Sequence, residues 1–396
     1  MPYKRFILTR EIIHGWGALK ALKSVPATRA FIVTDKMMVQ LGYPDRVEAI
    51  LNEKGAECRR FDEVEPDPSL DTVKKCLAQV MEFKPDLIIG LGGGSPIDAG
   101  KTVWAFYEHP DLAEMEWDEM RRQLPRRSLR QKAKYVAIPT TSGTGSEVSF
   151  GAVISNHQVD PPDKRILFSF QFTPDVAIVD AELASSMPPD VTAATGYDAL
   201  VHALEPFVGG PVSDIVDSLA VTSIKNILKW LPQAVADGSD VTAREKMHLA
   251  ATMAMAAGTN GTGSLNHDLA HQLGSFYHIV HGIANAVTLD HFLVWLYKYN
   301  PEAQAMLAEE LGMEVKSTRD GAQKLIKAMV ELRQKVGLPG SIKEIGIDEG
   351  VFMSQLDRLI EYTLASGLSS QKPTPEEVKE IYLKAWEGAE PALPPE

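Results

Sequence analysis

The histidines of this chain are unevenly distributed, and most of its ten lie beyond residue 200. Asp198 and His202 are four residues apart, and His267 and His271 repeat that spacing, which would place each pair on one face of a helix. His281 follows, beside a glycine. A carboxylate and three imidazoles suit Zn²⁺ or Fe²⁺ and leave a coordination position open for catalysis. The spacing therefore predicts a metal site, but it does not decide which of the three later histidines bind the ion.

Coincidental packing is the alternative explanation for any single pair of this kind. Two pairs followed by a His-Gly step favour a metal site over that alternative. The histidines that lack such a context are interpreted as structural or exposed, and they are His14, His109, His157, His248 and His291.

A glycine-rich segment, Gly92–Asp98, follows the apolar run 86–91, which is typical of a strand buried on both faces. Its glycines allow backbone amides to approach a ligand, and a helix that begins after them favours a pyrophosphate. Ser95 adds a hydroxyl donor or a helix cap. The spacing is not Gly-x-Gly-x-x-Gly, so a tight turn without a ligand explains this segment equally well.

A second loop of small residues, 140–147, also follows an expected strand, and its hydroxyls suit a phosphate or a ribose. Open α/β sheets bind ligands at the carboxyl edge of their strands, so the two loops together favour a dinucleotide. Asp35 closes an earlier strand, where a carboxylate accepts hydrogen bonds from a ribose and repels a 2′-phosphate. It therefore favours NAD over NADP, and capping of the next helix is an equally good explanation.

The order of elements predicts two domains. In residues 1–186, short apolar runs at 30–34, 86–91, 135–139 and 176–180 alternate with helical segments, as in an α/β domain with a parallel sheet flanked by helices. Residues 187–396 carry long segments of helical periodicity and predict an all-helical domain that holds the metal. The break between them is Met187-Pro188-Pro189-Asp190.

Composition narrows the class of function. The formal net charge is −13, and this acidic balance argues against a nucleic-acid or anionic-membrane partner. Two cysteines form neither a disulfide framework nor a cysteine-based zinc site, and the N-terminal residues lack the apolar run of a signal peptide. We expect a cytoplasmic protein with a small-molecule substrate. The basic segment 121–134 is interpreted as a solvated surface excursion, with a partner- or phosphate-binding site as its alternative.

Several motifs together resemble the iron-containing (group III) alcohol dehydrogenase family. They are GGGSPID at 92–98, PTTSGTGSE at 139–147, Lys164 ten residues before Pro174, TGYDALVH at 195–202, the pair His267 and His271, and HGIAN at 281–285. Segments 107–110 and 276–281 look most like the alcohol-dehydrogenase half of bifunctional aldehyde/alcohol dehydrogenases. The resemblance implies a dehydroquinate-synthase-like architecture, an active site between two domains, and a homodimer or larger homo-oligomer.

The resemblance also assigns roles that spacing leaves open. The implied ligands of the divalent metal, with Fe²⁺ expected and Zn²⁺ or Mn²⁺ as alternatives, are Asp198, His202, His267 and His281. His271 then becomes a catalytic proton-relay or cofactor-contacting residue, and packing beside the ligands is its alternative. The NAD(H)-binding residues expected from the loops and the resemblance are Asp35, Gly93, Gly94, Ser95, Asp98, Thr140, Thr141, Thr144, Ser149 and Lys164.

Three glycines depart from the family pattern in a way that bears on the substrate. Gly258 and Gly263 stand where relatives acting on short alcohols commonly carry an aromatic and a branched apolar residue, and Gly151 stands where bulkier residues occur. Together with Thr259 they predict a wide and polar substrate pocket. It would suit a polar or anionic aldehyde, such as a semialdehyde, sulfoacetaldehyde or phosphonoacetaldehyde. Filling of the vacated space by neighbouring helices is the alternative.

The expected reaction transfers a hydride between NAD(H) and a primary alcohol or aldehyde, with the metal acting as a Lewis acid on the substrate oxygen. A dehydrogenase for short aliphatic alcohols is the main alternative. A dehydroquinate-synthase-like lyase would need a cluster of basic residues for its substrate, and no such pattern is found. A non-catalytic scaffold would need neither the full set of ligand positions nor the two dinucleotide loops.

Overall fold

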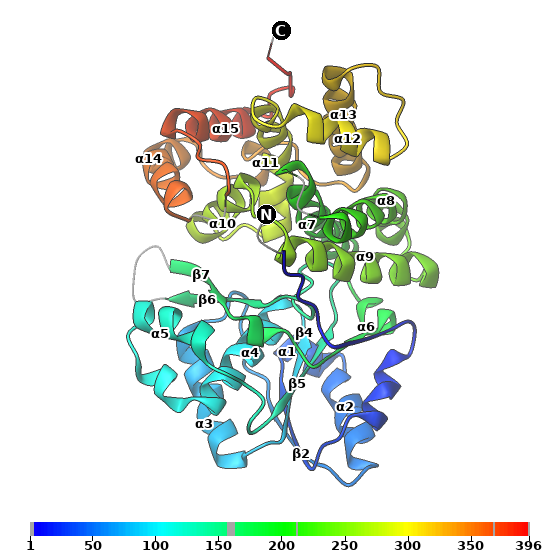
Figure 1. The fold of residues 1–396 in the computed structure, drawn as a ribbon, viewed down its shortest axis with the longest axis vertical. Helices are drawn as coiled ribbons and strands as arrows, with labels where there is room; N and C mark the ends of the chain where they lie inside the picture. The colour runs from blue at the N-terminus through cyan, green and yellow to red at the C-terminus, as the bar shows by residue number, and fades with distance from the viewer. Residues whose placement is uncertain (1–3, 157–162, 211–212, 367–368, 395–396) are drawn as a thin grey trace. The chain divides into compact units, whose positions relative to one another are not determined.

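The computed structural model describes residues 4–156, 163–210, 213–366 and 369–394. The chain divides into two compact units, Arg5–Ser186 and Met187–Glu396, and Lys4 belongs to the second of them. Figure 1 shows a sheet with flanking helices in the first unit and packed helices in the second. None of the described helices is long and apolar enough to cross a membrane.

A six-stranded parallel sheet forms the centre of the first unit, with the strand order β1-β8-β5-β4-β2-β3. Its strands are β1 (Glu11–His14), β2 (Arg29–Val33), β3 (Glu57–Phe61), β4 (Leu87–Gly92), β5 (Lys134–Pro139) and β8 (Val176–Val179). A separate antiparallel pair consists of β6 (Gly151–Asn156) and β7 (Asp163–Phe168). The helices of this unit are α1 (Lys36–Gln40), α2 (Tyr43–Asn52), α3 (Leu70–Phe83), α4 (Gly94–Glu108), α5 (Trp117–Gln123) and α6 (Ala181–Ala184).

Apolar side chains cover both faces of this sheet, as the run at 86–91 predicted. Leu87 and Ile89 of β4 belong to the core that includes α2, whereas Ile88 belongs to the core that includes α3 and α4. Figure 1 shows α2 on one side of the sheet and α3 and α4 on the other. The alternation of strand side chains between two helical layers is what a doubly wound α/β fold requires.

The chain changes direction across the sheet between β2 and β4. From β2 it passes to β3 on one side, and it then returns to β4 on the other side of β2. In open α/β sheets the crevice at such a reversal, outside the carboxyl ends of the strands, is where ligands bind. The residues that follow β2 and β4 are Asp35 and the glycine-rich turn.

The second unit is largely helical. Its helices are α7 (Pro189–Val208), α8 (Asp214–Ala236), α9 (Val241–Asn260), α10 (Leu265–Tyr277), α11 (His281–Leu296), α12 (Pro301–Glu310), α13 (Thr318–Lys335), α14 (Glu349–Ser366) and α15 (Pro375–Glu387). Proline at the first position of α7 favours a helix start there. The two-part fold class, a parallel sheet flanked by helices followed by a helical part, is confirmed.

Helices α10 and α11 form a tight hairpin whose connection contains only His278, Ile279 and Val280. His278 has φ of 55°, and its amide donates to the Gly274 carbonyl at 2.9 Å, which ends α10. Gly282, in the first turn of α11, lies against α7, and a Cβ there would be 1.9 Å from the Ala194 carbonyl oxygen. Glycine is therefore required for the observed approach of the two helices.

His291, which is 4% exposed on α11, links stability to pH. Burial, and to a smaller extent the positive charges of Arg333 and Lys384, lowers the pKa of His291 from 6.5 to about 4. As the pH falls from about 6.5 to about 4, the unfolded chain binds a proton that the folded chain does not, so stability decreases by up to about 3 kcal/mol. We expect His291→Gln to remove this part of the pH dependence.

Urea unfolding of metal-depleted protein at several pH values from 4 to 7.5 measures this effect. His14→Gln, at an exposed position, is the control and should keep the wild-type pH profile. Parallel profiles for the wild type and His291→Gln would contradict the prediction.

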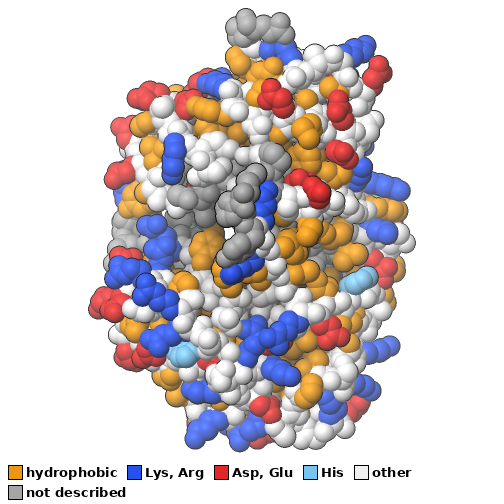
Figure 2. Space-filling view, viewed as in Figure 1, with side chains coloured by type: hydrophobic (Ala, Val, Ile, Leu, Met, Phe, Trp, Pro, Cys, Tyr) orange, Lys and Arg blue, Asp and Glu red, His pale blue; other side chains and the backbone are white. Residues whose placement is uncertain are grey.

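On the face shown in Figure 2, acidic and basic side chains are interspersed, with no continuous basic field.

Candidate metal centre and dinucleotide site

Three helices of the second unit bring acidic and imidazole side chains together. Asp198 lies on α7, His267 on α10, and His281 is the first residue of α11. One ligand atom from each of these three residues lies within 4.8 Å of the others. Asp198 Oδ1 is 3.8 Å from His267 Nε2 and 3.5 Å from His281 Nε2. These separations match donor atoms arranged around a space for one ion.

The other two histidines of the predicted site lie beside this group. The Nδ1 atom of His202 is 3.8 Å from Asp198 Oδ2, and its ring stacks on His267 with centroids 4.6 Å apart. His271 lies edge-on to His281 at 4.9 Å and to His267 at 6.3 Å. All five residues singled out by their spacing are thus neighbours.

The donor atoms of His267 fit a metal. Its Nδ1 lies 2.5 Å from Glu205 Oε2, which directs that nitrogen's hydrogen to the carboxylate and leaves Nε2 as the free donor. Nε2 is buried and has no hydrogen-bond partner among the described residues. A buried nitrogen without a partner is costly unless a ligand satisfies it, and here it faces a carboxylate. Carboxylate and imidazole donors suit Fe²⁺ or Zn²⁺.

The charges around this site favour a cation. Burial raises the pKa of Asp198, but His202, His281 and His267 outweigh it and hold the carboxyl well below its usual range. Burial lowers the pKa of His267, whereas Glu205 and Asp198 raise it to about 10. Two buried carboxylates therefore surround the imidazoles, and they compensate either a proton or a metal ion.

Residues that the sequence analysis missed hold the ligands in place. Asn285 Nδ2 donates to Asp198 Oδ1 at 2.9 Å, and its Oδ1 accepts from Asn266 Nδ2 at 3.0 Å. Thr288 donates to Asn266 Oδ1 at 2.9 Å, and none of these three residues has exposed surface. Helical spacing from the predicted ligands could have identified two of the supporting residues. Asn285 is four residues after His281, and Glu205 is three residues after His202.

Glu205→Gln is expected to weaken metal binding. The amide keeps the shape but is a weaker acceptor for His267 Nδ1, and loss of such a partner typically lowers metal affinity by about ten- to hundred-fold. Competition with a chelator of known affinity, using Zn²⁺ or Co²⁺, measures the change. Glu302→Gln, at an exposed position on α12, is the matched control. Equal affinities of the two variants would contradict the role of Glu205.

The first unit brings the two glycine- and hydroxyl-rich loops together. Gly92 has φ of 143°, a conformation that favours glycine, and begins the turn into α4. A Cβ on Gly94 would lie 2.9 Å from Thr144 Cγ2, and one on Gly93 would lie 3.5 Å from Thr141 Cγ2. The turn after β4 and the loop after β5 are therefore in contact at the carboxyl edge of the sheet. This narrow backbone cradle fits a pyrophosphate.

Asp35 caps α1 and also lies beside this turn. Its Oδ1 accepts from the Met38 amide at 2.9 Å, so the capping alternative is observed. Its Oδ2 is 3.3 Å from where a Cβ of Gly92 would lie. The cap and a contact with a ribose are compatible, because a carboxylate has several acceptor positions.

Several other residues predicted to bind the cofactor have side chains that contact groups of the protein itself. Asp98 accepts from the Val153 amide at 2.8 Å and from the Ser146 hydroxyl, and the Ser149 hydroxyl contacts Lys101 at 3.0 Å. Thr140 is buried, with its hydroxyl 3.3 Å from Met38 Sδ. Ser95 is half-buried in the first turn of α4. The side chain of Lys164 lies outside the described part of the structure.

Two of the glycines expected to widen a substrate pocket are closely packed. A Cβ on Gly258 would lie 2.9 Å from the His202 carbonyl oxygen, and one on Gly151 would lie 3.0 Å from Ile166 Cγ2. Glycine allows close packing at both positions, so the expectation of vacated space does not hold there. Gly263 is exposed, and its carbonyl accepts from the Ser370 amide at 3.3 Å, while Thr259 is half-buried near the end of α9.

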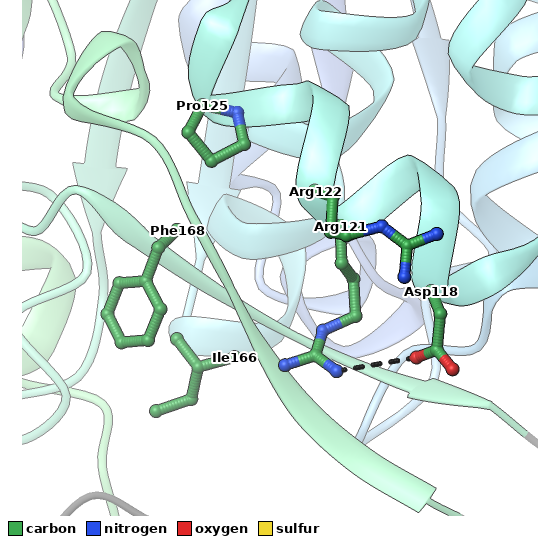
Figure 3. A pocket seen from close by; sticks show the side chains of 6 residues that line it. All are labelled: Asp118, Arg121, Arg122, Pro125, Ile166 and Phe168. Carbon is green, nitrogen blue, oxygen red and sulfur yellow. Dashed lines mark ion pairs between the residues drawn. The ribbon is translucent and has the colours of Figure 1, made fainter.

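Arginines of the basic segment take part in ion pairs on the surface of the first unit. Arg121 lies 3.7 Å from Asp118, and Arg130 Nε lies 2.7 Å from Asp175. Arg121, Arg122 and Pro125 line a hollow of about 280 Å³ together with Ile166 and Phe168. Figure 3 shows the Arg121 guanidinium directed to Asp118 rather than standing free. The paired charges agree with a solvated surface segment.

Comparison with known proteins identifies the family. The model of the iron-containing alcohol dehydrogenase family matches residues 9–181, and the model of the C-terminal part of the Fe-containing alcohol dehydrogenase family matches residues 192–386. The chain belongs to the iron-containing alcohol dehydrogenase family. The resemblance seen in the sequence motifs is thereby confirmed.

Members of this family resemble the chain over nearly its whole length. An NADPH-dependent butanol dehydrogenase from Clostridium saccharobutylicum is 38% identical, over 98% of this chain and 99% of its own. The bifunctional aldehyde-alcohol dehydrogenase of Escherichia coli K12 is 37% identical over 91% of this chain, which corresponds to 43% of that longer protein. The structure of an iron-containing alcohol dehydrogenase from Thermococcus thioreducens superposes with a TM-score of 0.87 at 34% identity, covering 97% of this chain and 100% of that one.

Proposed function

We propose that this protein is a metal-dependent oxidoreductase that transfers a hydride between NAD(H) and a primary alcohol or its aldehyde. The observation that carries the proposal is the convergence of Asp198, His267 and His281 within 4.8 Å, with His267 Nε2 lacking a hydrogen-bond partner among the described residues. The first unit, Arg5–Ser186, would bind the dinucleotide, and the second would bind the metal. We also infer a homo-oligomer, which light scattering tests.

The ligands in this proposal are Asp198, His202, His267 and His281, with Fe²⁺ as the expected ion and Zn²⁺ or Mn²⁺ as alternatives. When bound, the metal polarises the substrate oxygen and the nicotinamide donates or accepts the hydride. Glu205 orients His267, and Asn285 orients Asp198. His271, beside His281, is the candidate for exchanging the alcohol proton.

NADH oxidation with aldehydes, measured on metal-depleted protein before and after addition of Fe²⁺ or Zn²⁺, tests this function. Metal-dependent turnover is the expected result. Absence of metal-dependent turnover with NADH and with NADPH, across aliphatic and polar aldehydes, would overturn the proposal.

Asp35 supports a preference for NAD(H), although the butanol dehydrogenase relative is described as NADPH-dependent. Asp35→Ser is expected to raise the ratio of kcat/KM for NADPH to that for NADH by about ten-fold or more, because it removes a charge that repels the 2′-phosphate. Serine keeps the capping of α1, since it is itself a preferred N-cap residue.

Steady-state kinetics with both cofactors measures this ratio. Glu53→Gln, which removes an exposed charge after α2, is the control and should leave the ratio unchanged. An unchanged ratio in Asp35→Ser would show that Asp35 acts only as a helix cap.

We propose a polar or anionic aldehyde as the substrate, and this finer proposal is supported by Thr259 and Gly263 alone. The close packing of Gly151 and Gly258 favours a second candidate, a short aliphatic aldehyde. Comparison of kcat/KM for butyraldehyde, succinate semialdehyde and sulfoacetaldehyde distinguishes the two. A clear preference for butyraldehyde would overturn the polar-substrate proposal.

A further inference from the structure

Lys101 is a lysine of α4 with no exposed surface. Its Nζ lies within hydrogen-bond distance of four oxygens, and they are Gly151 O at 2.8 Å, Ser149 Oγ at 3.0 Å, Ser149 O at 3.1 Å and Ser146 Oγ at 3.2 Å. Asp98 Oδ1 is 3.7 Å away. An ammonium group has three donors, so more acceptors surround it than it can bond at once. This dense set of oxygens compensates a charge that would otherwise be very costly to bury.

The four oxygens all belong to residues 146–151, which overlap the end of the 140–147 loop predicted to contact the cofactor and continue beyond it. Lys101 lies on the helix that begins with the glycine-rich turn, two turns after Gly94. Asp98, on the same helix, adds its own bonds to Ser146 and to the Val153 amide. Lys101 and Asp98 therefore hold the C-terminal end of the loop against α4. Earlier in the loop, Thr144 contacts the first turn of α4 at Gly94.

We propose that Lys101 is a positioning residue for the dinucleotide, whose ammonium group fixes the 140–151 loop against α4 so that the loop and the glycine-rich turn form a preformed phosphate site. This inference rests on the proposed function. Preformed sites bind more tightly because less conformational freedom is lost on binding. A direct catalytic role is excluded by geometry, since a side chain without exposed surface does not reach a substrate.

The side-chain chemistry favours this role over simple core packing. Burial lowers the pKa of Lys101 to about 8 against the opposing influence of Asp98 and Glu147. A buried charge contributes little net stability compared with an apolar side chain of similar size, whereas it holds several backbone oxygens in one fixed arrangement. Two of the oxygens held here are backbone carbonyls, of Ser149 and Gly151.

The test is NADH binding to the full-length, Zn²⁺-loaded protein, followed by fluorescence, for the wild type and Lys101→Met. Methionine keeps the length of the side chain and removes the ammonium group. We expect the Kd for NADH to rise by about ten- to hundred-fold, the range that loss of charged hydrogen bonds produces. Hydrogen exchange of the 140–151 amides should accelerate, while exchange in β2 and α3 and the affinity for Zn²⁺ stay unchanged.

Thr102→Val is the matched control, because Thr102 is a fully buried neighbour on α4 whose hydroxyl donates to the helix backbone at Asp98 O and has no other hydrogen-bond partner among the described residues. It should bind NADH as the wild type does. NADH affinity of Lys101→Met within about two-fold of the wild type, with unchanged loop exchange, would overturn the inference. If Lys101→Met does not fold, NADH binding by the double variant Ser146→Ala/Ser149→Ala tests the inference instead. It removes two of the four acceptors, and wild-type affinity in this variant would likewise overturn the inference.

The outcome also separates this inference from the proposed function. A wild-type protein that binds neither NADH nor NADPH would refute both. A wild type that binds NADH with metal-dependent turnover, together with an unaffected Lys101→Met variant, would refute the positioning role alone.

Discussion

Replacing Asp198 with alanine is expected to abolish metal binding and to lower kcat/KM by about a thousand-fold or more, equivalent to about 4 kcal/mol of transition-state stabilisation. The reason is geometric. Asp198 is buried and lies 3.5 Å from His281 Nε2 and 3.8 Å from both His267 Nε2 and His202 Nδ1, so among the described residues it is the one carboxylate that faces all three proposed imidazole ligands. Without it, a dication would have no compensating charge among its ligands.

Elemental analysis of the purified variant and NADH oxidation after metal addition measure the two losses. Asp198→Asn is the sharper companion variant, because it keeps the shape of the side chain and removes the charge. Asp214→Asn, at an exposed position on α8, is the control and should retain both metal and activity. Full metal content in Asp198→Ala would show that the ion binds elsewhere.

The second large effect is expected from Gly282→Ala. A methyl group at Gly282 would lie 1.9 Å from the Ala194 carbonyl oxygen and 2.5 Å from its carbonyl carbon, so α11 has to move away from α7. Overpacking against rigid backbone costs about 1–3 kcal/mol, and more where neither element yields. Because Gly282 follows His281 and Ala194 precedes Asp198 by one helical turn, the same displacement should also weaken metal binding.

Thermal unfolding in the presence of a chelator isolates the packing effect, and metal titration measures the second loss. Gly274→Ala is a matched glycine substitution on α10, where the nearest atom to the new Cβ is the Ile279 carbonyl oxygen at 3.5 Å, an ordinary contact. It should be neutral or slightly stabilising, because alanine favours the helix more than glycine does. Equal stability of the two variants would contradict the tight crossing of α7 and α11.

The periodicity of apolar residues predicted the long helices and strands well, because the pattern that determines which face is buried lies within each element's own sequence. The buried strand expected at 86–91 coincides with β4 (Leu87–Gly92), and the long helical segments expected in residues 187–396 are observed as α7 to α15. Edge strand β3 and the antiparallel pair β6 and β7 were not predicted. β3, with the sequence ECRRF, has one fully buried residue, so its pairing with β2 is not visible as an apolar pattern.

The sequence motifs of the candidate site were easier to find than the residues that support them. Glu205 and Lys101 look like ordinary surface charges in a helix, and only the tertiary structure shows that each is buried against polar partners. Glycines were misjudged for a related reason. Gly258 was interpreted as open space, and it lies against the backbone of α7. A missing side chain looks the same in a sequence whether a ligand or another helix takes its place.

The hairpin of α10 and α11 has a consequence for folding. It carries His267 and His281 on neighbouring helices joined by three residues, whereas Asp198 and His202 lie on α7, with α8 and α9 intervening. An ion held by both groups would act as a cross-link that closes the chain around α8 and α9. Such a link stabilises the folded state by mass action and limits the freedom of the unfolded chain. Metal uptake would then depend on the docking of α7 onto the hairpin, and loss of the ion would first loosen that contact.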